Sequence, residues 1–122
     1  MPRFPVTALR SVELRVPDLA AALRFQEASW GLTLAHHARG RAWLRGSGAD
    51  ASILRLEEGP PAIASLTFRT VALDAVLARA QAAGATLLHA PAPLEEPGGG
   101  TAAMLRSPEG FVIRLVQGDS DR

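Results

Sequence analysis

Hydrophobic and polar residues alternate in the stretch SVELRV, residues 11–16. Its three apolar side chains would lie on one face of a strand, and its polar ones, Ser11, Glu13 and Arg15, on the other. Pro17 and Asp18 follow, and an aspartate just before a segment of helical periodicity is a typical N-cap. We therefore predict a half-buried strand over 11–16 and a helix over 18–28.

The remaining pattern supplies one more helix and several short strands. Apolar runs and alternations bounded by Gly, Pro and Ser predict strands over 32–37, 41–45, 51–58, 63–70, 85–90, 101–106 and 111–117, and a helix over 73–84 that ends at Gly84. The order of strand, helix and three strands thus occurs twice.

The repeated order has a matching repeat in the residues themselves. Ser65 repeats Ser11 at an offset of 54 positions, and Arg114 in VIRL repeats Arg55 in ILRL at an offset of 59. Two matches at nearly one offset indicate duplication more strongly than either match alone. We predict an α+β fold of two βαβββ modules, residues 7–59 and 62–118, within a single domain that spans 1–122.

Composition narrows the setting of this domain. The chain has 122 residues, of which 48% are hydrophobic, so it holds enough apolar material for one core. It has no cysteine and no long apolar run, which favours a cytoplasmic protein without a membrane span. The net charge is +1, with arginines scattered along the chain and few aromatics, so nucleic-acid binding is not expected.

The chain resembles a known superfamily in three stretches, 9–34, 40–85 and 95–117, and the resemblance extends over about residues 7 to 118. They are similar to the vicinal oxygen chelate superfamily of glyoxalases, bleomycin-resistance proteins and extradiol dioxygenases, most of all to the dioxygenase branch. The turn 107–110, Ser-Pro-Glu-Gly, resembles the Asp-Pro-Asp-Gly that precedes the last strand in that superfamily. The resemblance implies strands curved into a mixed sheet around a cleft, with metal ligands on the first and last strands of each module.

At the positions of those ligands, the chain departs from the superfamily. Ser11 and Ser65 stand where the resemblance would place histidines, and Arg55 and Arg114 stand at the positions of the last strands, the second of which normally holds a carboxylate. A guanidinium has no lone pair to offer a metal. His36 and His37 are neighbours on one strand and point to opposite faces, and His89 belongs to the other module. We therefore predict no metal and no other cofactor.

Strand parity predicts which side chains line the cleft. Ile113 and Leu115 should face the helices, so Arg114 should face the cleft, as should Arg55 in the other module. The expected ligand-binding residues are Ser11, Arg15, Trp43, Arg55, Ser65, Thr67, Arg69 and Arg114. Such a floor suits an anionic or polar ligand, because a guanidinium binds carboxylate and phosphate in a two-pronged manner. An internal ion pair from Glu13 to either arginine is the competing interpretation.

Four functions are compatible with these residues. The first is a metal-independent small-molecule binding protein of the bleomycin-resistance type, expected to be a homodimer. The second is an extradiol dioxygenase-like or glyoxalase-like enzyme. The third is a metal-free isomerase or lyase in which Glu13 is the catalytic base and an arginine holds a developing oxyanion. The fourth is a structural or regulatory module with an occluded cleft. The sequence does not decide whether the modules pair within one chain or between two chains.

Overall fold

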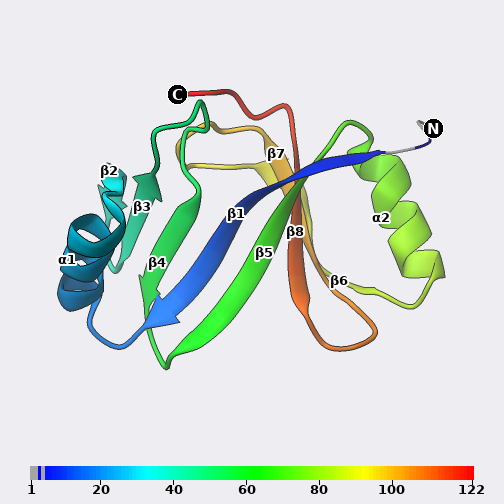
Figure 1. The fold of residues 1–122 in the computed structure, drawn as a ribbon. Coiled ribbons are helices and arrows are strands. Elements are labelled where there is room, and N and C mark those ends of the chain that lie inside the picture. The colour runs from blue at the N-terminus through cyan, green and yellow to red at the C-terminus, as the bar shows by residue number, and fades with distance from the viewer. Residues whose placement is uncertain (1–2, 4) are drawn as a thin grey trace.

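The structure is a computed structural model that describes residue 3 and residues 5–122. Its elements follow the predicted order (Figure 1): β1 (Val6–Val16), α1 (Leu19–Trp30), β2 (Thr33–Ala38), β3 (Arg41–Arg45), β4 (Leu54–Glu58), β5 (Ala62–Thr70), α2 (Leu73–Ala82), β6 (Thr86–Pro93), β7 (Thr101–Arg106) and β8 (Val112–Gln117). The prediction of an α+β fold with a βαβββ order that occurs twice is confirmed.

The eight strands form one mixed sheet in the order β2-β3-β4-β1-β5-β8-β7-β6. Within each module the first strand pairs in parallel with the last, β1 with β4 and β5 with β8. The two modules meet through the antiparallel pair β1 and β5 at the centre of the sheet. In this structure the two modules therefore pair within one chain.

The two helices lie at opposite ends of this sheet, on its outer side (Figure 1). The core of the second module packs α2 against β7 and β8 and consists of Leu73, Leu77, Ala103, Leu105 and Leu115. Ile113 also packs against it. Ile113 and Leu115 thus face the helix, as strand parity predicts, so the side chain between them, that of Arg114, points to the opposite face of the sheet.

Helix α1 begins at an aspartate cap and ends at a glycine. The Asp18 carboxylate accepts a hydrogen bond from the backbone N–H of Ala21 at 3.0 Å, and Gly31 closes the helix with a φ of 70°. No residue of α1 is fully buried, and Phe25 and Trp30 are exposed, with their rings packed edge to face. Neither described helix has the length and apolarity that a membrane crossing requires.

Candidate functional site

A buried cluster of polar side chains lies where the two modules meet. The Glu13 side chain on β1 is fully buried, and its carboxylate accepts hydrogen bonds from Ser11 Oγ and Ser65 Oγ, each at 2.7 Å, and from Thr67 Oγ1. The register of β1 and β5 places Glu13 opposite Ser65 and Ser11 opposite Thr67. Three hydroxyl donors therefore satisfy a carboxylate that would otherwise be costly to bury.

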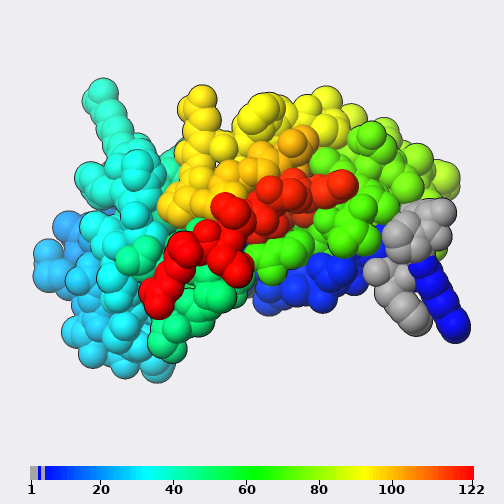
Figure 2. Space-filling model, turned by 90° about the horizontal axis from the view of Figure 1, so that it is seen from above, coloured from blue at the N-terminus to red at the C-terminus, as the bar shows by residue number. Residues whose placement is uncertain are grey.

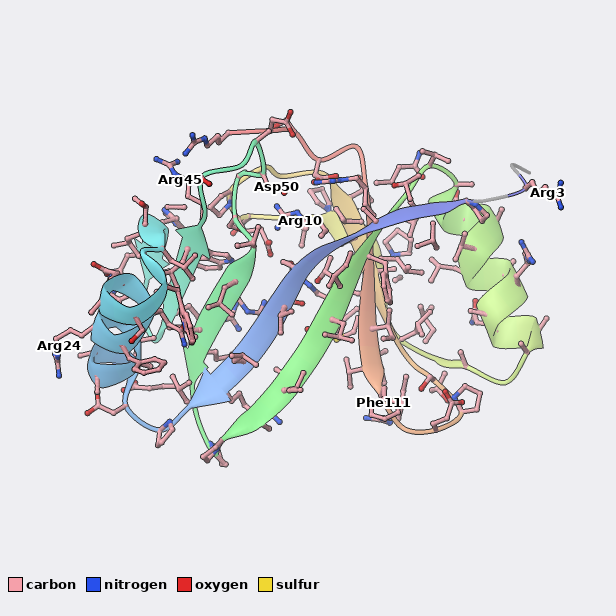
Figure 3. The ribbon with its side chains drawn as sticks, viewed as in Figure 1. Arg3, Arg10, Arg24, Arg45, Asp50 and Phe111 are labelled. Carbon is pink, nitrogen blue, oxygen red and sulfur yellow. The ribbon has the colours of Figure 1, made fainter. Side chains whose placement is uncertain are left out.

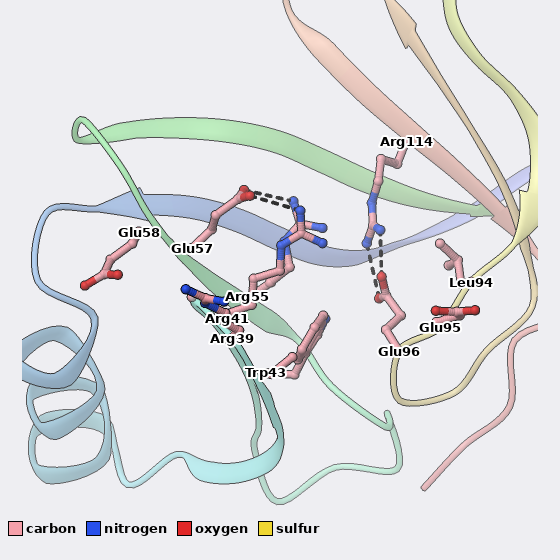
Figure 4. A pocket seen from close by; sticks show the side chains of 12 residues that line it. Arg39, Arg41, Trp43, Arg55, Glu57, Glu58, Leu94, Glu95, Glu96 and Arg114 are labelled. Carbon is pink, nitrogen blue, oxygen red and sulfur yellow. Dashed lines mark hydrogen bonds and ion pairs between the residues drawn. The ribbon is translucent and has the colours of Figure 1, made fainter.

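Arg114 on β8 adds a cation to this cluster. Its Nε donates to Thr67 Oγ1 at 2.8 Å and lies 3.3 Å from Glu13 Oε1. Its two terminal nitrogens donate to the Glu96 carboxylate, Nη1 to Oε1 at 2.7 Å and Nη2 to Oε2 at 3.3 Å (Figure 4). Burial by itself would lower the pKa of Arg114, but the Glu96 hydrogen bonds and the Glu13 charge outweigh it and raise the pKa. The internal ion pair between Glu13 and Arg114 is thus present.

Arg55, the counterpart of Arg114 in the first module, has a much poorer environment. Its nearest ion pair is from Nη2 to Glu57 Oε2 at 3.7 Å, and Glu57 is also bound by Arg41 at 3.1 Å. The buried Nε of Arg55 has no hydrogen-bond acceptor among the described residues. Burial, followed by the charge of Arg114, lowers the pKa of Arg55. Arg55 therefore lies beside a second cation without a carboxylate of its own.

Trp43 is the cross-strand neighbour of Arg55, because β3 and β4 pair with these two residues in register. Its side chain is almost completely buried, and its Nε1 is a second donor without an acceptor in the described part of the chain. The Trp43 ring also packs against the His36 ring, with centroids 5.3 Å apart. Two unsatisfied N–H donors, Arg55 Nε and Trp43 Nε1, consequently lie on neighbouring strands.

Arg55, Trp43 and Arg114 line a cleft on the inner face of the sheet (Figure 4). The cleft consists of two adjoining pockets of about 680 and 480 Å³ that share Arg41, Arg55, Glu57, Leu94 and Arg114. Trp43 lines the first pocket. The second has an apolar wall that includes Leu88, Pro93, Leu94, Met104 and Val112. The cleft thus combines charged and apolar surfaces.

Most residues that the sequence predicts for the cleft lie in it or directly beneath it. Arg15, Trp43, Arg55, Ser65 and Arg114 line the two pockets. Ser11, Glu13 and Thr67 form the buried cluster and do not line either pocket.

Arg69, which is also predicted for the cleft, lies elsewhere. Its guanidinium is bound by Asp119 at 2.7 Å and by Asp50 at 3.1 Å. Both carboxylates raise the pKa of Arg69, and the hydrogen bonds to Asp119 contribute most. Arg69 does alternate with its neighbours as the strand pattern predicts. It does not reach the cleft because the C-terminal segment, whose path the strand pattern does not predict, covers this end of β5.

Sequence reasoning missed a second set of buried charges, centred on Arg10. Its side chain points into the molecule (Figure 3), where it donates to Pro97 O at 2.8 Å and Ser52 O at 3.1 Å, and its Nε lies 3.2 Å from Asp119 Oδ2. Arg10 Nη1 lies 3.9 Å from Glu96 Oε2. A ladder of alternating charges therefore connects the C-terminal segment to the cleft, in the order Arg69, Asp119, Arg10, Glu96, Arg114 and Glu13.

Asp119 should make the stability of the fold depend on acid pH. Burial would raise its pKa, but hydrogen bonds from Arg69 and Arg10 hold the pKa below the usual range. A carboxylate with a lowered folded-state pKa stabilises the fold fully above its unfolded pKa of about 3.9, and the contribution is lost as pH falls through the folded value. We expect D119N to lower the free energy of unfolding by about 1.5–3 kcal/mol at neutral pH.

The difference between D119N and wild type should begin to narrow below about pH 4 and disappear only as the pH falls through the lowered folded-state pKa of Asp119, because both folded proteins then lack the ionised carboxylate. Urea denaturation between neutral pH and pH 3 would measure this, with D121N as the control because Asp121 is exposed and forms no ion pair within the described part of the chain. A difference between D119N and wild type that is independent of pH would contradict the ion-pair explanation.

Comparison with known proteins assigns the fold. A scan against models of protein families found no match, and a search of curated proteins found none either. Among solved structures, the Mn(II)-bound glyoxalase from Novosphingobium aromaticivorans superposes with a TM-score of 0.91 at 28% identity, over 96% of this chain and 40% of that one. Homoprotocatechuate 2,3-dioxygenase from Brevibacterium fuscum, in complex with 3,4-dihydroxyphenylacetate, superposes with a TM-score of 0.82 at 23% identity, over 99% of this chain and 40% of that one. The chain has the fold of the vicinal oxygen chelate superfamily, to which these glyoxalase and dioxygenase structures belong.

These matches establish the fold of this chain but not its activity or its ligand. The chain spans only about 40% of the length of each relative. Both branches of the superfamily occur among the matches, a glyoxalase at 28% identity and a dioxygenase at 23%. The vicinal oxygen chelate fold is established, whereas activity and ligand are matters for proposal.

The donor chemistry of the cleft does not fit a divalent metal. Its central carboxylate, Glu13, is already bound by three hydroxyls and lies 3.3 Å from a guanidinium. His36 and His37 lie on β2, and His89 on β6. Among the described residues no group of three His, Asp or Glu side chains is arranged to hold a metal ion. Arg55 and Arg114 would also repel a cation placed between them.

Proposed function

We propose that this protein binds a small anionic or polar molecule in its cleft without the help of a metal ion. The observation that carries the proposal is that two of the three buried donors without acceptors, Arg55 Nε and Trp43 Nε1, belong to residues that line the cleft, whereas the third, Arg45 Nε, belongs to a residue that lines neither pocket. A buried N–H that lacks an acceptor costs about 1–3 kcal/mol, more when the group is charged, so native proteins rarely leave one without a reason. We expect ligand oxygens to supply the acceptors that these donors lack.

The charge environment favours an anionic oxygen over a neutral one. The pKa of Arg55 is lowered by burial and by Arg114, and the Glu57 carboxylate that lies nearest is shared with Arg41. An anion beside Arg55 would offset the burial of its charge and its repulsion from Arg114. A guanidinium also offers planar, paired donors, which suit a carboxylate or a phosphate.

The shape of the cleft adds an apolar requirement. The pocket of about 480 Å³ next to Arg55 has Leu88, Leu94, Met104 and Val112 in its wall. Its volume lies in the usual range for small-molecule sites, which combine apolar walls with a few polar groups. The ligand that suits both features has an anionic head at Arg55 and a compact apolar body along β6 and β7.

The buried environment of Glu13 supports a binding protein over a metal-free isomerase or lyase. A general base needs a free lone pair within reach of the substrate proton. Both Glu13 oxygens accept hydrogen bonds, and the side chain is fully buried beneath the cleft. A catalytic role for Glu13, a homodimer and a cytoplasmic location stay predictions from the sequence.

The proposal predicts that binding depends on the two unsatisfied donors. With benzoate as the probe, R55M should bind about 10- to 100-fold more weakly, because a hydrogen bond to a charged group contributes about 1.5–3 kcal/mol. W43F keeps an aromatic ring but loses the donor, and should bind about 3- to 10-fold more weakly. Isothermal titration calorimetry of chelator-treated protein would measure both.

Two controls make this test specific. R24M removes an arginine from the outer face of α1, far from the cleft (Figure 3), and should bind benzoate as wild type does. Benzamide has nearly the shape of benzoate without the charge and should bind less tightly. Benzoate affinity that R55M leaves unchanged, or that chelator abolishes and Mn²⁺ restores, would overturn the proposal.

A further inference from the structure

Glu96 already shows how the cleft holds a carboxylate. It comes from the loop between β6 and β7, and its two oxygens accept from Arg114 Nη1 at 2.7 Å and from Nη2 at 3.3 Å. The Glu96 side chain is only 5% exposed, yet the residue lines the larger pocket together with Arg114. A planar carboxylate bound through both oxygens by a guanidinium is a recognition geometry as well as an ion pair.

We propose that Arg114 is a carboxylate subsite of the cleft, and that Glu96 is a built-in occupant which the carboxylate of a ligand displaces. This inference rests on the proposed function, because it assumes that the cleft binds a small molecule, and it narrows the ligand class to carboxylic acids. Arg55 and Arg114 are counterparts in the two modules. Arg114 is already bound by the Glu96 carboxylate, whereas no carboxylate binds Arg55 in this way.

Arg114 is positioned to exchange one carboxylate for another. Its Nε stays anchored on Thr67 at 2.8 Å and close to Glu13 at 3.3 Å, whatever its outer nitrogens bind. Arg114 also lines both pockets, so its outer edge faces the space that a ligand would occupy. The exchange replaces the ion pair of Arg114 with Glu96 by an ion pair of Arg114 with the ligand carboxylate. The net change in free energy is small because the two pairs are chemically alike.

Glu96 has a second cation close by. Arg10 Nη1 lies 3.9 Å from Glu96 Oε2, so a displaced Glu96 would move toward a charge that already attracts it. The loop continues through Gly98, Gly99 and Gly100, all with positive φ, in a conformation that glycine adopts readily. Arg10 holds the loop at Pro97 O, and Ser120 N donates to Gly98 O at 2.8 Å. The loop is thus held in place beyond Glu96, so the proposed exchange requires only the Glu96 side chain to move.

Removal of Glu96 should convert the subsite into an open one that a small carboxylate fills. We expect E96A to melt about 5–10 °C below wild type, since a buried guanidinium loses its partner. Added acetate should raise the melting temperature of E96A in a saturable manner, whereas sodium chloride at the same ionic strength should not. Wild type should respond much less, because its own carboxylate competes.

Three comparisons complete the experiment. E109A alters an exposed glutamate in the turn 107–110 that lines neither pocket of the cleft, and should melt and respond as wild type does. E96A/R114M lacks the guanidinium and should show no response to acetate beyond that to chloride. Sulfate in place of acetate tests whether the subsite prefers the planar two-oxygen group. Should E96A fail to fold, E96S, which keeps a small polar side chain and still vacates the place of the carboxylate, replaces it in the same titrations.

The outcomes separate this inference from the proposed function. Equal effects of acetate and chloride on E96A, an acetate response that survives in E96A/R114M, or a stronger response to sulfate than to acetate would overturn the carboxylate subsite. Rescue by acetate together with benzoate binding that R55M does not weaken would keep the subsite and reject the role proposed for Arg55. Loss of benzoate binding in R55M without acetate rescue of E96A would do the reverse.

Discussion

Replacing Glu13 by glutamine should lower the free energy of unfolding by about 3–5 kcal/mol, the usual cost of removing one partner from a buried ion pair. The carboxylate accepts from Ser11, Ser65 and Thr67 and faces Arg114 at 3.3 Å. Glutamine has nearly the same shape, but its amide nitrogen is a donor and meets hydroxyl groups that already donate. Urea denaturation at neutral pH, with the slope compared between variants, would measure the loss.

A control variant and a double-mutant cycle make this prediction specific. E58Q changes an exposed glutamate at the end of β4 and should shift stability by less than about 0.5 kcal/mol. The double variant E13Q/R114M should cost less than the two single changes together, with a coupling of about 0.5–3 kcal/mol for residues in one network. Additive losses would mean that Glu13 and Arg114 do not stabilise each other, despite their short separation.

Much of this arrangement could be predicted from the sequence because it follows from strand parity. The alternation in 111–117 places Arg114 on the face opposite Ile113 and Leu115, and the structure confirms it. The repeat of βαβββ is likewise visible in the order of periodic segments. Parity also brings Ser65 and Thr67 to the inner face of β5, where they meet Glu13.

Parity could not predict the residues whose placement depends on irregular backbone. The pairing of β1 with β5 shifts register between Leu9 and Ser11, so Arg10 and Ser11, adjacent in sequence, are both buried. A bulge of this kind re-aims a side chain that strict alternation would send outward. Trp30 and Phe25, with their large apolar rings, are exposed on α1, because nothing in the described chain covers them.

Loops account for the other residues that were missed. Glu96 and Asp119 lie outside any strand, and their partners are far away in sequence: Glu96 binds Arg114, and Asp119 binds Arg10 and Arg69. Figure 2 shows the C-terminal segment, in red, lying across the top of the molecule between its two halves. No local pattern specifies such a path, because it is fixed by long-range ion pairs that form only after the sheet has assembled.

The loop carboxylate makes the two modules unequal. Arg55 and Arg114 occupy equivalent places beside the central strands, since β4 pairs Arg55 with Glu13 and β8 pairs Arg114 with Thr67. Only Arg114 receives a carboxylate from the loop of its own module, Glu96. In the first module the connection between β2 and β3 contains only residues 39–40, an arginine and a glycine, and offers no carboxylate. The buried donors without acceptors, Arg55 Nε and Trp43 Nε1, therefore belong to the first module.

Arg10 should be as important for stability as Glu13, and R10M should lower the free energy of unfolding by about 3–5 kcal/mol. Its side chain is 1% exposed and donates to Ser52 O and Pro97 O, beside its ion pair with Asp119 at 3.2 Å. Methionine fills much of the volume but leaves two carbonyls and a carboxylate with fewer donors in a buried place. Because Arg10 connects the Glu96 loop to the C-terminal segment, both should loosen together.

Hydrogen exchange would distinguish this local effect from general destabilisation. In R10M we expect faster exchange at Gly99 and Ser120, whose N–H groups donate to Glu96 O and Gly98 O. Exchange within β7 and β8 should change only as far as global stability does. R41M, which removes an exposed ion pair with Glu57, is the matched arginine control and should cost at most about 1 kcal/mol. Uniformly faster exchange across the sheet in R10M, without a larger increase at Gly99 and Ser120, would contradict this prediction. It would mean that Arg10 does not hold the Glu96 loop and the C-terminal segment together.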